Sequence, residues 1–385
     1  MRSITPFEPP DIILKDVHAA VPRHLLQSST ARSLYYIARH CAVTMLFYWC
    51  ATCIPSGGSL LSRSALWLAY GAWQGFAFAG IWCLGAQAGH DALSPHPLVN
   101  AALGLLLHSF VLTPYYSWRA THRAHHATTN NLDRDETYLP PLRSDFGLPE
   151  AAYARPADYM HALGETPAFT LFKLFIRQFF GFQLYLIHNR KGNRRYPPWT
   201  SHYNPSSALF RPEQRGSIIL SNVAIASMFV VLWVYTQRAG AAALAKFYIL
   251  PWLFAHNWIV TATYLQHASP WVPYYRTPAW TFARGALATV DRPLYGWVGR
   301  FFMHHIASDH VAHHFFSGVP FYNLPEVTAA IRPVLGEHYN YDDTPALVAL
   351  WQAFTQCTFV EDKGDVVLFR NRAGQAQRTV NGEAN

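Results

Sequence analysis

The residues with the clearest chemical potential are two copies of a His-x-x-His-His motif. One copy is His310, His313 and His314, and the other, much earlier in the chain, is His122, His125 and His126. On a helix, residues three or four positions apart share a face, so each copy can direct two or three imidazoles at one point. Imidazole is a good ligand for iron, zinc, copper and nickel. One such motif would be weak evidence, but two copies in a chain this apolar predict a metal site.

The number of histidines bears on which metal is bound. A zinc site needs three or four ligands, so the two motifs hold too many histidines for one zinc and enough for two metals. Further histidines, His304 and His305, lie just upstream of the later motif. The residues alone leave zinc and a pair of redox metals both open.

Composition indicates a membrane protein. Of the 385 residues, 51% are hydrophobic and only 14% are charged, whereas about a quarter are charged in an average soluble protein. The apolar residues are clumped into runs, which favours one polytopic membrane domain over two soluble domains. The net charge of +8 comes from basic residues that are scattered or flank apolar runs. No nucleic-acid-binding motif accompanies them, so we assign the charge to an anionic membrane surface and expect no nucleic-acid partner.

Four apolar segments are expected to span the bilayer, at about 41–53, 65–86, 217–235 and 241–265. Short turns join them into two hairpins, which puts both termini and both histidine motifs on the side rich in Lys and Arg, the cytosol. The expected fold is an all-α integral membrane protein with four transmembrane helices and a cytosolic helical cap that carries the motifs. Residues 1–32 form a cytosolic N-terminal segment without a signal peptide, 33–345 the membrane domain, and 346–385 a cytosolic C-terminal tail over the site.

Two further apolar segments need a different placement. If residues 98–115 crossed the membrane, the two histidine motifs would lie on opposite sides, so we expect a re-entrant or membrane-embedded helix there. Residues 169–187 are apolar but contain Lys173, Arg177 and Gln178, which is typical of an amphipathic helix lying along the bilayer surface. The five cysteines are expected to be small buried side chains without disulfides.

The chain resembles the membrane-bound fatty acid desaturases, in particular the fungal delta-12 oleate desaturases. The order, spacing and flanks of several stretches carry the resemblance, from about residue 11 to about residue 345: Ser33-Leu-Tyr-Tyr, Pro114-Tyr-Tyr-Ser-Trp-Arg119 leading into His122-Arg-Ala-His-His126, Ser201-His-Tyr-Asn-Pro-Ser-Ser207, Thr263-Tyr-Leu-Gln-His267, Trp280-Thr-Phe-Ala-Arg-Gly-Ala-Leu-Ala-Thr-Val-Asp-Arg292, His310-Val-Ala-His-His314 and Ala330-Ile-Arg-Pro-Val-Leu-Gly-Glu-His-Tyr339. It implies an enzyme of the endoplasmic reticulum membrane that holds two iron ions and uses O2 to oxidise a lipid or fatty acyl chain. Electrons would come from cytochrome b5 and its NADH-dependent reductase, as separate proteins.

The resemblance also implies the iron ligands. They would be His90, His122, His125, His126, His310, His313 and His314, with His267 completing the set. His304 matches a position that is often histidine in the family, and its role is less defined. His108, near the end of an apolar segment, is expected to bond backbone or lipid head groups rather than metal.

One departure from the family pattern falls at the site itself. The family's first box reads His-x-x-x-His, and here the first of these histidines is replaced by Ala86, which cannot bind metal. Gln87 stands where an acidic residue is common, and either Gln87 or Asp91 could supply an oxygen ligand instead. Ser308 and Asp309 also differ from the acidic residue and threonine usual before the last box.

Three functions therefore remain open. The first is an active di-iron oxidase of modified specificity, whose product could be an alkene, an alcohol or an alkyne. The second is a catalytically degenerate relative that binds a lipid or a partner protein. The third is a membrane hydrolase or zinc enzyme built on the same histidines.

Overall fold

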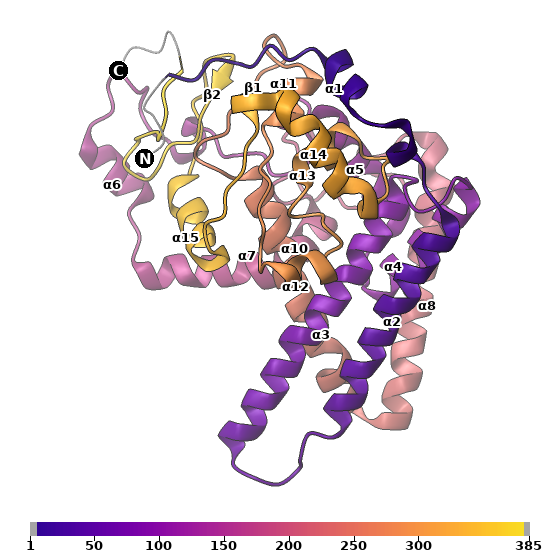
Figure 1. The fold of residues 1–385 in the computed structure, drawn as a ribbon. Coiled ribbons are helices and arrows are strands. Elements are labelled where there is room, and N and C mark those ends of the chain that lie inside the picture. The colour runs from indigo at the N-terminus through magenta and orange to yellow at the C-terminus, as the bar shows by residue number, and fades with distance from the viewer. Residues whose placement is uncertain (1–5, 381–385) are drawn as a thin grey trace.

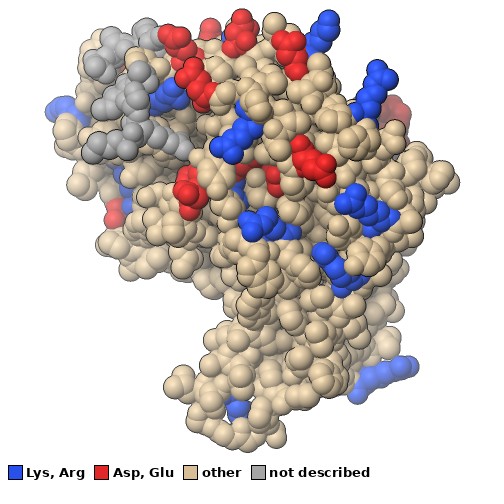
Figure 2. Space-filling model, in the orientation of Figure 1, with Lys and Arg blue, Asp and Glu red and all other residues tan. Residues whose placement is uncertain are grey.

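The computed structural model describes residues 6–380 and has two parts: a stalk of long helices and a broader cap at one end of it (Figure 1). The stalk contains α2 (Thr30–Thr52), α3 (Leu60–Gly89) and α8 (Arg215–Ala239). Ser29 and Ser59 begin the first two helices, since each side chain accepts a hydrogen bond from a backbone N–H of the first turn. Figure 2 shows few charged side chains on the visible face of the stalk and many on the cap.

The second predicted hairpin begins with α8. Gly240, at φ +87°, ends α8, and the chain continues through α9 (Ala241–Leu244), a π-helical turn η4 (Ala245–Ile249) and α10 (Leu250–His267). The α10 helix packs closely on α3 because two glycines of α3 leave room for it. A Cβ on Gly71 would lie 2.7 Å from Leu250, and one on Gly75 would lie 2.5 Å from Phe254.

The four-span prediction is supported only in part by length and hydropathy. Pro212–Ala239 is long and apolar enough to cross a membrane by itself, and the pair Pro97–Phe110 and Tyr115–Thr128 passes the same test jointly, bent by 107°. The α2 helix starts at Thr30 and therefore includes Arg39 and His40, and the π-helical turn interrupts the run that leads into α10. The four-span arrangement remains a prediction.

The expected re-entrant segment is the bent pair α4 (Pro97–Phe110) and α5 (Tyr115–Thr128). Leu112 adopts a left-handed conformation at φ +57°, and Pro114 precedes the first residue of α5. The Tyr115 ring then packs over Gly104, where a Cβ would lie 2.2 Å from it. The bend thus directs the earlier histidine motif back toward the end of α3, rather than away from it.

The α7 helix (Pro167–His188), expected to be interfacial, runs across the base of the cap (Figure 1). Its outward face is apolar, because Phe169, Leu171, Phe172 and Phe175 are each more than half exposed. The C-terminal tail forms α15 (Ala346–Gln356) and contributes side chains to a cavity described below.

The rest of the cap consists of short elements. These are α1 (Leu14–Ala20), η1 (Arg23–Leu26), η2 (Arg143–Phe146), α6 (Pro156–Leu163), η3 (Pro212–Gln214), α11 (Phe282–Leu287), α12 (Trp297–Phe302), α13 (His310–Phe315), η5 (Phe321–Asn323), α14 (Leu324–Leu335), η6 (Gly336–His338), and the strands β1 (Tyr274–Tyr275) and β2 (Val366–Val367). The two strands pair antiparallel, with Tyr274 opposite Val367. The described chain is therefore predominantly helical, as predicted.

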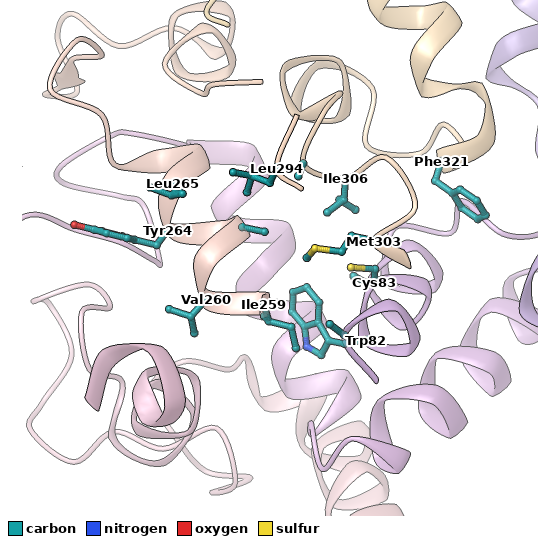
Figure 3. Packing of buried hydrophobic residues seen from close by; sticks show 14 of the residues in the cluster. Trp82, Cys83, Ile259, Val260, Tyr264, Leu265, Leu294, Met303, Ile306 and Phe321 are labelled. Carbon is teal, nitrogen blue, oxygen red and sulfur yellow. The ribbon is translucent and has the colours of Figure 1, made fainter. Parts of the chain in front are cut away.

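The apolar core connects the stalk with the cap. Side chains from α3, α10 and residues 303–306 form one buried cluster, in which Figure 3 shows Trp82, Cys83, Ile259, Met303 and Ile306. This cluster fixes the end of α3 against the end of α10. His90 follows the last residue of α3, and His267 is the last residue of α10.

Candidate metal centre

The ends of four helices meet at the site. His90 caps the C-terminus of α3, and His267 is the last residue of α10. Three histidines, His122, His125 and His126, lie on α5, and the other three, His310, His313 and His314, on the short helix α13. All eight sequence-predicted histidines are brought together by the structure.

Four of them form one group, which we call the four-ring group: His90, His122, His126 and His313. One nitrogen of each lies within 4.8 Å of those of the others. The His90 ring is central, with centroid distances of 4.4 Å to His126, 4.8 Å to His122 and 5.0 Å to His313. The Nε2 atom of His90 is buried and makes no hydrogen bond within the described chain.

The other four histidines form a second group, which we call the His267 group: His125, His267, His310 and His314. Nitrogens of His125, His267 and His314 lie within 4.8 Å of one another. His310 joins them, since its Nε2 is 3.1 Å from that of His267 and 3.0 Å from that of His314. The two groups are adjacent, because the rings of His126 and His314 stack at 4.1 Å.

Hydrogen bonds fix the tautomers in the His267 group. Nδ1 of His125 lies 2.7 Å from the Asp135 carboxylate, so it carries the proton. Nδ1 of His310 donates to the Ile306 carbonyl at 3.2 Å. The Thr129 hydroxyl donates to the His125 carbonyl and therefore accepts from Nδ1 of His314.

With these Nδ1 atoms protonated, the Nε2 lone pairs face one another. Those of His310 and His314 meet at 3.0 Å with no proton between them. Lone pairs at this distance repel unless a cation lies among them, so the arrangement fits a bound metal ion. Holding the outer nitrogen of each ligand is what keeps a metal-binding imidazole oriented.

Burial suits the rings for metal binding. The pKa of His90, His126, His267 and His314 falls well below its ordinary value, first because burial disfavours the charged ring and then because of neighbouring histidines. The pKa of His313 falls to about 3 for the same reasons. The rings are neutral at pH 7, which is the form that binds metals. An all-imidazole donor set in two groups fits two transition-metal ions.

The departure at residue 86 is visible in the structure. Ala86 is buried one helical turn before His90, whose N–H lies 3.2 Å from the Ala86 carbonyl. The suggestion that Asp91 replaces the missing ligand is wrong: Asp91 accepts from Arg119 at 3.1 Å and from Arg123 at 2.6 Å. At φ +59° its backbone turns away from the helix that ends at His90.

Gln87 remains the candidate for an oxygen ligand. It is fully buried, and neither its Oε1 nor its Nε2 has a hydrogen-bond partner within residues 6–380. Among the buried amide side chains of residues 6–380, no other lacks partners for both atoms. A buried, unpaired amide is costly unless a ligand, ion or water satisfies it.

Sequence reasoning missed the residues that orient the rings. Asp135 is 1% exposed and also accepts from the Asn130 N–H at 2.8 Å. It lies ten residues after His125, next to Glu136 and close to Asp133, and nothing in the sequence distinguishes it from these two carboxylates. His304 lies outside both groups and its ring lies 4.9 Å from that of His40. His108, as expected, bonds backbone: its Nε2 lies 3.0 Å from the Trp82 carbonyl.

Ser308 and Asp309 do not enter the groups. Asp309 precedes the first residue of α13, accepts a hydrogen bond from the Ser308 hydroxyl at 2.7 Å, and lies 3.4 Å from Nδ1 of His305. Its backbone carbonyl accepts from the His313 N–H at 3.0 Å, at the start of the helix that carries the later motif.

A cavity of about 1030 Å³ adjoins the histidines. His122, His125, His267 and His310 form part of its wall. Much of the remaining wall is apolar or aromatic, with Trp82 from α3, Phe182 from α7 and Val260 from α10. Mostly apolar cavities of about this size are typical of small-molecule binding sites.

Comparison with known proteins agrees with this site. A family model described as "Fatty acid desaturase" matches residues 65–345. A delta(12) fatty acid desaturase of Mortierella isabellina is 38% identical over 369 residues, covering 94% of this chain and 92% of the relative. An oleoyl-12-hydroxylase of Ricinus communis is 37% identical, covering 95% and 92%, and an oleate hydroxylase of Claviceps purpurea is 34% identical, covering 95% and 82%. The histidine motifs, the helical membrane-type fold and these matches together establish that the chain belongs to the fatty acid desaturase family.

Proposed function

We propose that the protein is a membrane di-iron oxidoreductase that uses O2 to oxidise a C–H bond of a fatty acyl chain. The observation that carries the proposal is the meeting of eight imidazoles in two adjacent groups beside an apolar cavity. One iron would be held by the four-ring group and the other by the His267 group. Its relatives include both a delta(12) desaturase and oleate hydroxylases by name, which fits this class of reaction.

The chemistry and the protein's contribution are separate. When bound, the irons would supply activation of O2. In desaturation, O2 would be reduced to two waters. The donor would supply two electrons, solvent two protons, and the acyl chain two hydrogen atoms. Hydroxylation instead inserts one oxygen atom and releases one water. The protein orients its ligands through Asp135, Thr129 and the Ile306 carbonyl, and the cavity wall positions the acyl chain.

The proposed cellular setting follows the same family. The stalk would cross the endoplasmic reticulum membrane in four spans, with both termini and the site in the cytosol. Support comes from the few charged side chains on the visible face of the stalk (Figure 2) and from the bend that returns α5 toward α3. Cytochrome b5 and its NADH-dependent reductase would deliver the electrons.

A single preparation tests the proposal. The full chain is purified in detergent, its metals are counted, and product is assayed with NADH, cytochrome b5, its reductase and O2. Two irons per chain with an O2-dependent acyl product supports the proposal. Two irons without product would favour a lipid-binding relative, and zinc in place of iron would favour a hydrolytic enzyme.

A further inference from the structure

His90 enters the four-ring group from the end of a helix. It is the C-cap of α3, and Asp91 after it adopts a left-handed conformation at φ +59°. The Asp91 N–H bonds the Ala88 carbonyl at 3.1 Å. The Ala92 N–H bonds the Gln87 carbonyl at 3.0 Å, which completes the Schellman ending of a helix. Glycine usually takes the left-handed position of this ending, because a Cβ disfavours it. An aspartate there therefore has a role beyond the turn.

Two arginines of α5 hold Asp91. Arg119 donates from Nε to the Gly89 carbonyl at 3.1 Å and from a terminal nitrogen to both Asp91 carboxylate oxygens at 3.1 Å. Arg123 repeats the arrangement, at 2.7 Å to the Gly89 carbonyl and 2.6 Å to the carboxylate. We call these contacts the Asp91 clamp. They join the residues on both sides of His90 to α5.

The clamp satisfies groups that would otherwise be unfavourable. The Gly89 carbonyl belongs to the last turn of α3, where carbonyls have no partner within the helix and cations match the negative end of its dipole. Arg119 and Arg123 are four residues apart on α5, a spacing at which like charges repel. The Asp91 carboxylate bonds both and offsets that repulsion. An asparagine at this position would keep the turn but could not neutralise the arginines.

The four-ring group has fewer hydrogen bonds that orient its rings than the His267 group has. In the His267 group, Nδ1 of His125, His310 and His314 is held by a carboxylate, a carbonyl and a hydroxyl. In the four-ring group, Nδ1 of His126 and that of His313 have no hydrogen-bond partner within residues 6–380. The placement of the rings in the four-ring group therefore depends more on how their backbones are held.

The substitution at residue 86 makes this dependence strongest for α3. With Ala86 in place of a histidine, His90 is the single residue of α3 in the four-ring group, and it lies where helices fray. The α5 helix supplies both His122 and His126 to the same group. A clamp from α5 thus fixes His90 relative to these two rings, whose centroids lie 4.8 Å and 4.4 Å from its own.

We propose that Asp91, held by Arg119 and Arg123, is a positioning residue that fixes His90 for metal binding and makes up for the ligand missing at residue 86. The proposal rests on the proposed function in one respect, that the four-ring group holds a metal ion. The Asp91 side chain is 39% exposed, so its charge can be removed without opening the core. Ion pairs this exposed contribute little to folding, which leaves the placement of His90 as their main effect.

Metal binding to the full chain in detergent tests the clamp. The probe is Fe(II), titrated into the metal-free protein without oxygen; bound ions are counted per chain, and Mössbauer spectra distinguish the two groups. The test variant is Asp91→Asn, which keeps the shape of the side chain and tolerates a left-handed backbone. The matched control is Asp145→Asn, which removes a carboxylate that is 40% exposed, pairs with Arg194 and belongs to neither histidine group.

We expect Asp91→Asn to bind the ion of the four-ring group roughly tenfold more weakly, and the ion of the His267 group with native affinity. The unfolding temperature of the metal-free variant should match that of the native protein, which separates positioning from a loss of fold. Asp145→Asn should match the native protein in both affinities.

Restoring the missing ligand gives a second comparison. In an Ala86→His background, Asp91→Asn should weaken the ion of the four-ring group only about two- to threefold, because α3 then supplies two ligands. Native affinity in Asp91→Asn, equal loss of both ions, or an undiminished loss in the Ala86→His background overturns the proposal. A native protein that binds no metal overturns the proposed function as well, whereas two ions in both native protein and Asp91→Asn overturn the clamp alone. If Asp91→Asn does not fold, Arg123→Gln replaces it with the same expected loss, since Arg123 reaches the same two acceptors.

Discussion

The carboxylate of Asp135 lies 2.7 Å from Nδ1 of His125, and both side chains are almost fully buried. This contact keeps the ring proton on Nδ1 of His125. The unprotonated Nε2 then faces Nε2 of His267 at 3.3 Å. We therefore expect Asp135→Asn to weaken metal binding about 10- to 100-fold, because the amide no longer fixes the tautomer and orientation of the ring. A metal titration of the apo protein measures this.

The control for Asp135→Asn is Asp133→Asn. Asp133 is two residues away, but its side chain is 43% exposed and pairs with Arg276. Its substitution should leave metal affinity unchanged, and equal losses in both variants would contradict a specific role for Asp135.

Replacing Ala86 should strengthen the four-ring group. Ala86→His places an imidazole one turn before His90 on the same face of α3, so we expect iron occupancy to rise. Ala88→His, which points to another face of the helix, should not raise it. Unchanged occupancy in Ala86→His would show that another ligand already fills the position.

Gln87 allows a test in which two measurements move in opposite directions. Gln87→Leu removes a buried amide that lacks partners, so the metal-free protein should gain roughly 1 kcal/mol or more of stability. If the amide contacts the metal or its bound water, the same variant should bind metal about tenfold more weakly.

Gln74→Leu is the matched control for Gln87→Leu. Gln74 is also buried in α3, but its Nε2 donates to the Thr44 carbonyl at 3.1 Å. Its loss should destabilise the protein without changing metal affinity. A metal affinity unaffected by Gln87→Leu would exclude Gln87 from the site.

Lys191 should make folding stability depend on pH. Its pKa is about 8 in the folded protein, against about 10.4 for a free lysine. The unfolded chain therefore binds this proton more tightly, so the charged side chain disfavours folding below pH 8, and this penalty disappears as pH rises to about 10.4.

We expect the native protein to gain stability relative to Lys191→Gln between pH 7 and 9.5, because the native side chain loses its charge and the variant has none to lose. Thermal unfolding in detergent measures both proteins, and a difference that stays constant over this interval would contradict the prediction.

Packing between α3 and α4 should be sensitive to one methyl group. A Cβ on Gly85 would lie 2.1 Å from the His108 ring, which is itself fixed by the Trp82 carbonyl. Gly85→Ala should therefore destabilise the protein by about 1–3 kcal/mol. Gly216→Ala, in the first turn of α8 with open space around it, should be neutral or stabilising; thermal unfolding in detergent measures both.

The sequence predicted the parts of this molecule that depend on local pattern. Apolar runs located the long helices, and histidine spacing located the rings that converge. Local pattern could not explain the two polar residues inside the first apolar helix. Arg39 lies over the Phe301 ring at 4.4 Å, and His40 bonds the Ala77 carbonyl. Such partners come from distant segments, so the first span was expected to begin only near residue 41, although the helix is continuous from Thr30.

The same distinction applies to the site. The eight histidines were identified from motifs and family resemblance, but their division into two groups was not. Adjacent residues of α5 belong to different groups: His125 lies in the His267 group and His126 in the four-ring group. Asp91 was a reasonable oxygen donor by position, and only its ion pairs with Arg119 and Arg123 exclude it.

The contribution of α13 to both groups affects how the protein matures. A nascent chain that stops before residue 310 has at most three imidazoles of the four-ring group, and only His125 and His267 of the other. If the two groups hold metal as proposed, neither has its full set of ligands until α13 has left the ribosome and docked. We therefore expect metal loading late in biogenesis, and C-terminal truncations upstream of α13 should accumulate as protein with little bound metal.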